Sequence, residues 1–213
     1  MEQNKQRIVV KVGTSTLTHN SGALDLWSME HLVRTLADLQ GMGHEVILVS
    51  SGAIAVGTAK LGLSERPKEL RMKQAAAAVG QCRMMHIYDK FFSEYNRSMA
   101  QILLTGDDVE DPERAEHLSN TFSALLEMGV IPVVNENDSV SSAEIETGRH
   151  KVLGDNDTLS AIVAELCRAD LLVLLSDIDG LYDADPKTHP EAKLLHQVTE
   201  LTPEILEMAG GAG

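Results

Sequence analysis

Several short runs of small, polar and acidic residues hold the side chains that could do chemistry. These runs are Gly13-Thr-Ser-Thr16, Ser50-Ser-Gly-Ala53, Asn135-Glu-Asn-Asp138, Gly154-Asp-Asn-Asp157 and Ser176-Asp-Ile-Asp-Gly180. A glycine turn that opens a helix presents backbone N–H groups and a partial positive charge to an anion. Lys11, just before the first run, is a compact cation suited to phosphate oxygens. Together these residue types favour a site for a small anionic ligand that carries phosphate.

Each feature also has a purely structural interpretation. The glycine runs suit tight strand-to-helix turns, and the Asp and Asn residues suit helix caps and turns. Lys11 could be a solvated edge lysine, but Val10 and Val12 flank it in an apolar strand, which favours a functional role. A helix needs only one cap, but residues 155–157 are three in a row that could serve as one. Asp155 and Asp157 also place like charges close together. That arrangement costs stability unless a cation or a ligand compensates.

The pattern of apolar residues predicts the elements that must position these runs. Short apolar runs predict strands at 7–13, 45–50, 99–105, 130–134 and 171–175. Helical spacing predicts helices at 27–40, from Gly52, at 67–95, from Pro112, at 158–168 and at 203–208. Residues 139–153 show no period and indicate a loop or a loose hairpin. This alternation predicts a three-layer αβα sandwich with a mainly parallel central sheet.

The predicted topology also brings the polar runs together. In open α/β sheets, ligands bind outside the carboxyl ends of the strands. Four of the runs directly follow a predicted strand, and the run at 154–157 opens a helix. We therefore expect these side chains to converge on one edge of the sheet.

Composition excludes several classes of function. The 213 residues carry a formal net charge of −14, and only 3% are aromatic, so we expect no binding to nucleic acid. The sequence has no apolar run near the roughly 20 residues that span a bilayer, and its start is polar, so we expect a cytoplasmic protein without membrane attachment. Cys82 and Cys167 make no disulfide framework and are expected to be small buried side chains. Histidine spacing predicts no metal site in the protein itself.

The five motifs, in this order, resemble the amino acid kinase family. The resemblance rests on Lys11-Val-Gly-Thr-Ser15, Ser51-Gly-Ala-Ile54, Asn135-Glu-Asn-Asp138, Gly154-Asp-Asn-Asp157 and Ser176-Asp-Ile-Asp-Gly-Leu-Tyr182. In detail the motifs are similar to those of the members that phosphorylate the γ-carboxylate of L-glutamate with ATP. That reaction yields L-glutamyl 5-phosphate and is the first step of proline biosynthesis.

The resemblance implies a role for each motif residue. Lys11 would neutralise the transferring phosphoryl group, and Asp157 would position the catalytic lysines. The residues implied for glutamate are Ser51, Gly52, Asn135, Asp138 and Asn156. Those implied for the nucleotide are Gly13, Ser176 and Asp177, with Mg2+ held mainly through the nucleotide phosphates.

The resemblance also sets expectations for the whole chain. It implies a homo-oligomer, and L-proline as a feedback inhibitor near the glutamate site. Residues 1–213 would form one amino acid kinase domain that is incomplete at its C-terminal end. It would be weakly active by itself, because family members continue into a glycine-rich segment with a second phosphate-binding lysine. Two alternatives stay open: a related kinase of the N-acetylglutamate type, and a non-catalytic protein that senses glutamate or proline.

Overall fold

The computed structural model describes residues 5–140 and 156–209, and the chain divides into two compact units, Met1–Leu175 and Ser176–Gly213. The first unit holds the strands β1 (Arg7–Val12), β2 (Glu45–Ser50), β3 (Ser98–Leu104), β4 (Val130–Glu136) and β5 (Leu171–Leu175). Its helices are α1 (Thr14–Leu17), α2 (Leu26–Gly41), α3 (Ala53–Lys60), α4 (Leu70–Glu94), α5 (Gly106–Glu110), α6 (Pro112–Glu127) and α7 (Asn156–Leu166). The second unit holds α8 (Pro203–Ala209) and an isolated bridge between Tyr182 and Leu194.

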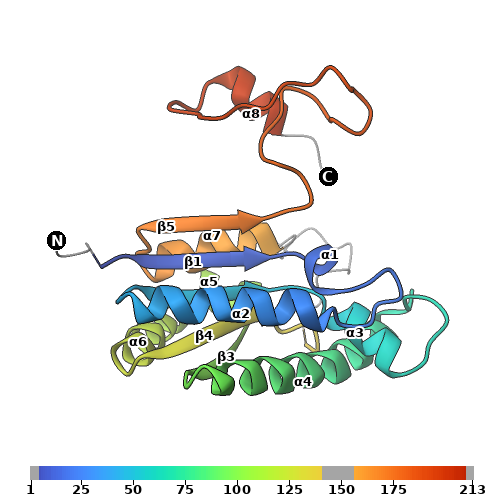
Figure 1. Cartoon of the computed structure of the whole chain (residues 1–213), viewed down its shortest axis with the longest axis vertical. Coiled ribbons are helices and arrows are strands. Elements are labelled where there is room, and N and C mark those ends of the chain that lie inside the picture. The colour runs from blue at the N-terminus through green and yellow to red at the C-terminus, as the bar shows by residue number, and fades with distance from the viewer. Residues whose placement is uncertain (1–4, 141–155, 210–213) are drawn as a thin grey trace. The chain divides into compact units, whose positions relative to one another are not determined.

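The five strands form one parallel sheet in the order β3-β4-β2-β1-β5. Strand β1 lies between β2 and β5, and its Lys11 is in register with Val49 on one side and Leu174 on the other. Because all the strands run the same way, their carboxyl ends meet at one edge, as Figure 1 shows for β1 and β5.

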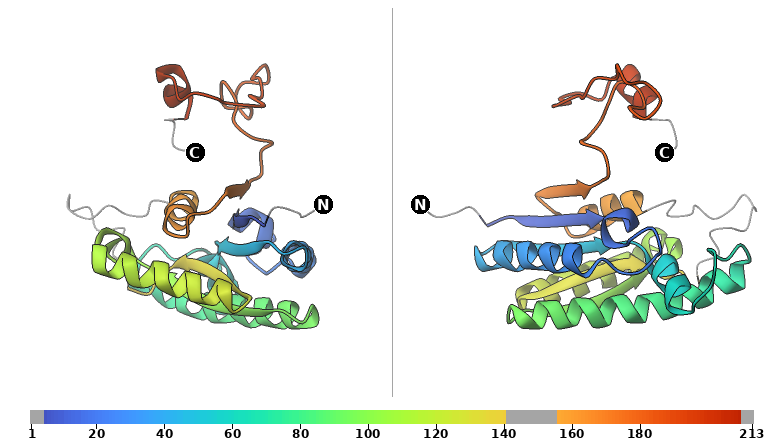
Figure 2. Two further views of the ribbon diagram at one scale, coloured as in Figure 1. Left: turned by 90° about the vertical axis from the view of Figure 1, so that its left-hand side faces the viewer. Right: turned by 45° about the vertical axis from the view of Figure 1, so that its right-hand side comes forward.

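Helices cover both faces of the sheet, so the predicted αβα sandwich is confirmed. One core packs α2, α3 and α4 against the sheet and includes Val10, Leu48, Tyr88 and Phe92. The other core packs α6 and α7 against the opposite face and includes Val9, Phe122 and Leu159. In Figure 1, α2 lies in front of the sheet and α7 behind it, and the two views of Figure 2 show the same layers from other sides.

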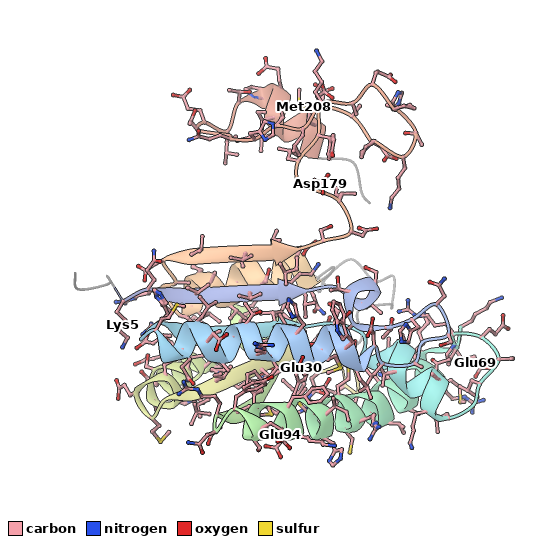
Figure 3. The ribbon with its side chains drawn as sticks, in the orientation of Figure 1. Lys5, Glu30, Glu69, Glu94, Asp179 and Met208 are labelled. Atoms are coloured by element: carbon pink, nitrogen blue, oxygen red, sulfur yellow. The ribbon has the colours of Figure 1, made fainter. Side chains whose placement is uncertain are left out.

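Local sequence explains where the main helices begin and how they are held. The side chain of Asp25 accepts hydrogen bonds from the first N–H groups of α2, and Asp111 does the same for α6, whose first residue is Pro112. At the far end of α4, the Tyr95 hydroxyl donates to the Glu30 carboxylate on α2. Glu30 and Glu94 are labelled in Figure 3, on α2 and near the end of α4.

Two glycines let α3 and α4 cross in direct backbone contact. A Cβ added to Gly57 of α3 would lie 1.7 Å from the carbonyl oxygen of Ala76, and one added to Gly80 of α4 would lie 1.8 Å from that of Ala53. No side chain fits at such distances, so both positions require glycine. The crossing holds the start of α3 at the carboxyl edge of the sheet.

The structure differs from the sequence prediction at several element ends. Strand β4 continues through Glu136, two residues beyond its predicted end, and α7 begins at Asn156, two residues before its predicted start. The short helices α1 and α5 were not predicted, because four or five residues show no periodicity. Cys167 is buried, but the prediction for Cys82 was wrong: it lies on the exposed side of α4. Residues 141–153 of the predicted 139–153 loop lie outside the described part of the chain.

Candidate active site

Lys11 and Asp157 form an ion pair at the carboxyl edge of the sheet. Lys11 Nζ lies 2.6 Å from Asp157 Oδ1, and the Lys11 side chain is 13% exposed whereas that of Asp157 is 49% exposed. Strand β1 supplies the lysine next to its last residue, and the first turn of α7 supplies the aspartate. The short contact fixes the direction of the Lys11 ammonium group, while the Asp157 side chain stays partly open to solvent.

The backbone beside this ammonium group leaves room for a phosphate oxygen. A Cβ added to Gly13 would lie 3.8 Å from Lys11 Nζ and 3.9 Å from Ser15 Oγ, so glycine keeps carbon away from the cation. The donors present, an ammonium and a hydroxyl, match the chemistry of a phosphate group. Lys11, Gly13 and Ser15 therefore fit one of the phosphates of a nucleotide.

A second cluster joins three strand-to-helix segments through side-chain amides. Asn156 Nδ2 donates to Ser51 Oγ at 2.5 Å, and also approaches Asn135 Oδ1 and the Ser50 carbonyl oxygen, each at 3.3 Å. Asn135 Nδ2 in turn donates to Gln81 Oε1 at 3.0 Å, and both of these side chains are buried. Residues from β2, β4, α4 and α7 thus meet in one hydrogen-bonded network.

These residues face a pocket of about 300 Å³, here named the strand-end pocket. It is lined by Ser51, Gly52, Arg66, Asn135, Asp138 and Asn156, among others. Gly52 caps α3 with a φ of +105°, a conformation that L side chains rarely adopt, so the turn from β2 into α3 requires glycine there. The pocket has the volume of a small organic ligand.

Asp138, which lines the strand-end pocket, has a displaced pKa. Burial raises the pKa of Asp138 to about 6, the nearby Glu136 acts in the same direction, and the Arg66 guanidinium opposes both. A carboxylate that lacks its full hydration is well placed to bind a cation, such as a substrate ammonium group.

The structure therefore brings together eight of the ten residues singled out in the sequence. Lys11, Gly13 and Asp157 lie around the ion pair, and Ser51, Gly52, Asn135, Asp138 and Asn156 lie around the strand-end pocket, so that Asn156 and Asp157 link the two groups. Ser176 and Asp177 belong to the second unit, where the Lys187 ammonium, 3.3 Å from Asp177 Oδ2, lowers the pKa of Asp177. The assignment of these two residues to a nucleotide site stays a prediction.

Sequence reasoning missed three residues of the site. Arg66 comes from the loop before α4 and lines the pocket, as does Thr14, the first residue of α1. Gln81 lies in the middle of α4, where it looks like any other helix residue. A polar residue at a position predicted to face the core was the one signal that could have pointed to Gln81.

Two classes of feature are absent from the described residues. Within residues 5–140 and 156–209, no group of three or more His, Cys, Asp or Glu side chains is placed to hold a metal ion. In the same ranges, no helix combines the length and apolar character needed to cross a membrane.

Comparison with known proteins identifies the family. A model of the amino acid kinase family matches residues 6–211. The chain belongs to the amino acid kinase family. It is 55% identical over 211 residues to the glutamate 5-kinase of Clostridium perfringens, covering 99% of this chain and 78% of that protein. It is 56% identical over 212 residues to the glutamate 5-kinase of Carboxydothermus hydrogenoformans, where the match covers 99% of this chain and 55% of the relative.

Solved structures of other kinases share the fold of this amino acid kinase. The UMP kinase of Ureaplasma parvum superposes with a TM-score of 0.60 at 15% identity, covering 98% of this chain and 86% of that one. At this identity the likeness concerns the fold alone.

Proposed function

We propose that this site transfers the γ-phosphoryl group of ATP to the γ-carboxylate of L-glutamate, giving L-glutamyl 5-phosphate, the first step of proline biosynthesis. One observation carries the proposal. Two consecutive residues of α7 serve two different groups: Asn156 bonds into the strand-end pocket and Asp157 bonds Lys11. A pocket for an amino acid therefore adjoins a cation for a phosphate, and the identity to two glutamate 5-kinases supports glutamate as the amino acid.

The strand-end pocket is proposed to hold the glutamate. The Asp138 carboxylate would pair with the substrate ammonium, because that carboxylate is partly buried and lacks an ion pair shorter than 4 Å among the described residues. Ser51 and Asn156 would bind a substrate carboxylate, with Gly52 and Asn135 completing the pocket. Arg66, which also lines it, offers a further cation for the other carboxylate.

The chemistry requires charge stabilisation more than proton transfer. The γ-carboxylate of glutamate is ionised at neutral pH and needs no general base, so its oxygen forms a bond to phosphorus as the bond from phosphorus to the ADP oxygen breaks. The Lys11 ammonium would offset the negative charge on the phosphoryl oxygens, and Asp157 would keep that ammonium in place. Gly13 beside Lys11, with Ser176 and Asp177, is proposed to contact the nucleotide, and Mg2+ bound through its phosphates would neutralise further charge.

Several properties of the whole protein belong to the same proposal. Residues 1–213 are proposed to form one amino acid kinase domain, supported by a family match that spans both units. The protein is proposed to act in the cytoplasm as a homo-oligomer, with L-proline as an inhibitor that competes near the strand-end pocket.

Substrate profiling of the purified protein tests the proposal. With ATP and Mg2+, we expect L-glutamate to yield ADP together with an acyl phosphate that hydroxylamine traps as a hydroxamate. N-acetyl-L-glutamate and glutarate are the matched controls, because each lacks the free ammonium that Asp138 would bind, and we expect neither to react well.

The other outcomes point to other functions. Faster turnover of N-acetyl-L-glutamate would indicate the related type of kinase, whereas calorimetric binding of glutamate without ADP release would indicate a sensing protein. Turnover that is unchanged at saturating L-proline would refute the proposed inhibition.

A further inference from the structure

The amide network behind the strand-end pocket has a fixed direction. A backbone carbonyl oxygen can only accept hydrogen bonds, so the Asn156 atom near the Ser50 carbonyl must be the donor Nδ2. The same Nδ2 faces Asn135, which must therefore present its acceptor Oδ1 and turn its own Nδ2 toward α4. Gln81 must meet that donor with Oε1.

This direction determines what Ser51 can do. Ser51 Oγ accepts a hydrogen bond from Asn156 Nδ2 at 2.5 Å. A serine hydroxyl that accepts one bond still has its own proton to donate, and Ser51 lines the strand-end pocket. The network therefore leaves the Ser51 O–H available as a donor to an acceptor in the pocket, such as a carboxylate.

Gln81 is the end of the chain of amides farthest from Ser51. It is 8% exposed, and its Nε2 has no hydrogen-bond partner within residues 5–140 and 156–209. Burying an amide with one unpaired end costs free energy of folding. A glutamine at this position therefore needs a role that an apolar side chain could not fill. A second pocket, of about 400 Å³, lies on the Gln81 side and shares Ala53, Glu136 and Asp138 with the first.

We infer that Gln81 is a positioning residue for the acceptor substrate, an inference that rests on the proposed function. By accepting from Asn135, Gln81 holds the two asparagine amides in one orientation, and that orientation directs the Ser51 proton toward a carboxylate of glutamate. Without the Gln81 acceptor, the Asn135 amide is free to rotate. Its Nδ2 can then face Asn156, two donors meet, and the Ser51 hydroxyl loses its fixed role.

The test replaces Gln81 with methionine, which keeps the length and volume of the side chain and removes its acceptor. We expect Gln81→Met to raise the KM for glutamate about tenfold, which is the scale of one lost hydrogen bond to a charged group. The kcat should change less than threefold, and the KM for ATP should stay unchanged.

The matched control is Gln40→Met on α2. Like Gln81, Gln40 uses one end of its amide in a hydrogen bond, here Nε2 donating to the Gly129 carbonyl oxygen at 2.9 Å, and its other amide atom is buried and unpaired. Gln40→Met should lower the melting temperature and leave the KM for glutamate unchanged.

A double-mutant cycle separates positioning from a general structural effect. If Gln81 acts through Asn135, Gln81→Met should add less than a twofold change in KM once Asn135→Leu is present. Additive effects would overturn the inference, as would a wild-type KM in Gln81→Met.

If the methionine variant does not fold, Gln81→Asn is used, since its shorter amide cannot reach Asn135. A wild-type KM in that variant would also contradict the inference. A parent protein that does not phosphorylate glutamate would instead refute the proposed function.

Discussion

At the scale of single residues, the charge state of Asp138 should control substrate binding. Its pKa is raised to about 6, mainly by burial, so the carboxylate becomes protonated as the pH falls through that value. A neutral Asp138 cannot pair with the substrate ammonium. The KM for glutamate should therefore rise about tenfold for each pH unit below 6 and stay level between about 7 and 8.

The matched variant for this prediction is Asp138→Asn. It lacks a titrating group at that position, so its KM should be high and nearly independent of pH between 5 and 8. Steady-state kinetics across this range give the answer. A wild-type KM that stays flat through pH 6 would show that Asp138 does not bind the ammonium.

At the scale of elements, the crossing of α3 and α4 holds the strand-end pocket open. A methyl group on Gly80 would collide with the Ala53 carbonyl at 1.8 Å and push the start of α3 away from β2. We expect Gly80→Ala to destabilise the protein by about 2 kcal/mol and to raise the KM for glutamate, because Ala53 lines the pocket. Denaturant unfolding and steady-state kinetics measure the two effects.

Gly41→Ala is the control for this prediction. Gly41 ends α2 within reach only of the flexible Arg97 guanidinium, and its φ is not positive, so alanine should be neutral or slightly stabilising there. Equal stability losses in the two variants would show that the backbone contact at Gly80 does not decide the effect.

The same scale explains what the sequence could predict. Strands and long helices were predicted because buried apolar residues recur along them. The polar runs included Ser51 and Asp157, and Lys11 lies just before the first run. The pairing of Asn135 with Gln81 was not predictable, because it depends on where α4 packs. That position is decided by two glycines whose contacts, Ala76 for Gly57 and Ala53 for Gly80, lie far along the chain. The prediction ended β4 two residues too early and began α7 two residues too late, because the motif residues themselves complete those elements.

At the scale of the whole molecule, the net charge of −14 opposes the approach of anionic substrates. Salt screens this repulsion over a distance of about 10 Å at 0.1 M ionic strength. We therefore expect kcat/KM for ATP to rise as KCl increases from about 10 to 100 mM. A steady fall over that range would show that a local positive field around Lys11 outweighs the charge of the whole chain.

We propose that Lys11 acts on the transferring phosphoryl group while a separate pocket binds glutamate. The decisive experiment compares kcat with the calorimetric Kd for glutamate in Lys11→Ala. We expect kcat to fall about 100-fold or more, since the variant lacks a cation that stabilises the transition state, and the Kd for glutamate to change less than threefold. A kcat close to that of the wild type, or a Kd weakened as strongly as kcat is reduced, would contradict it.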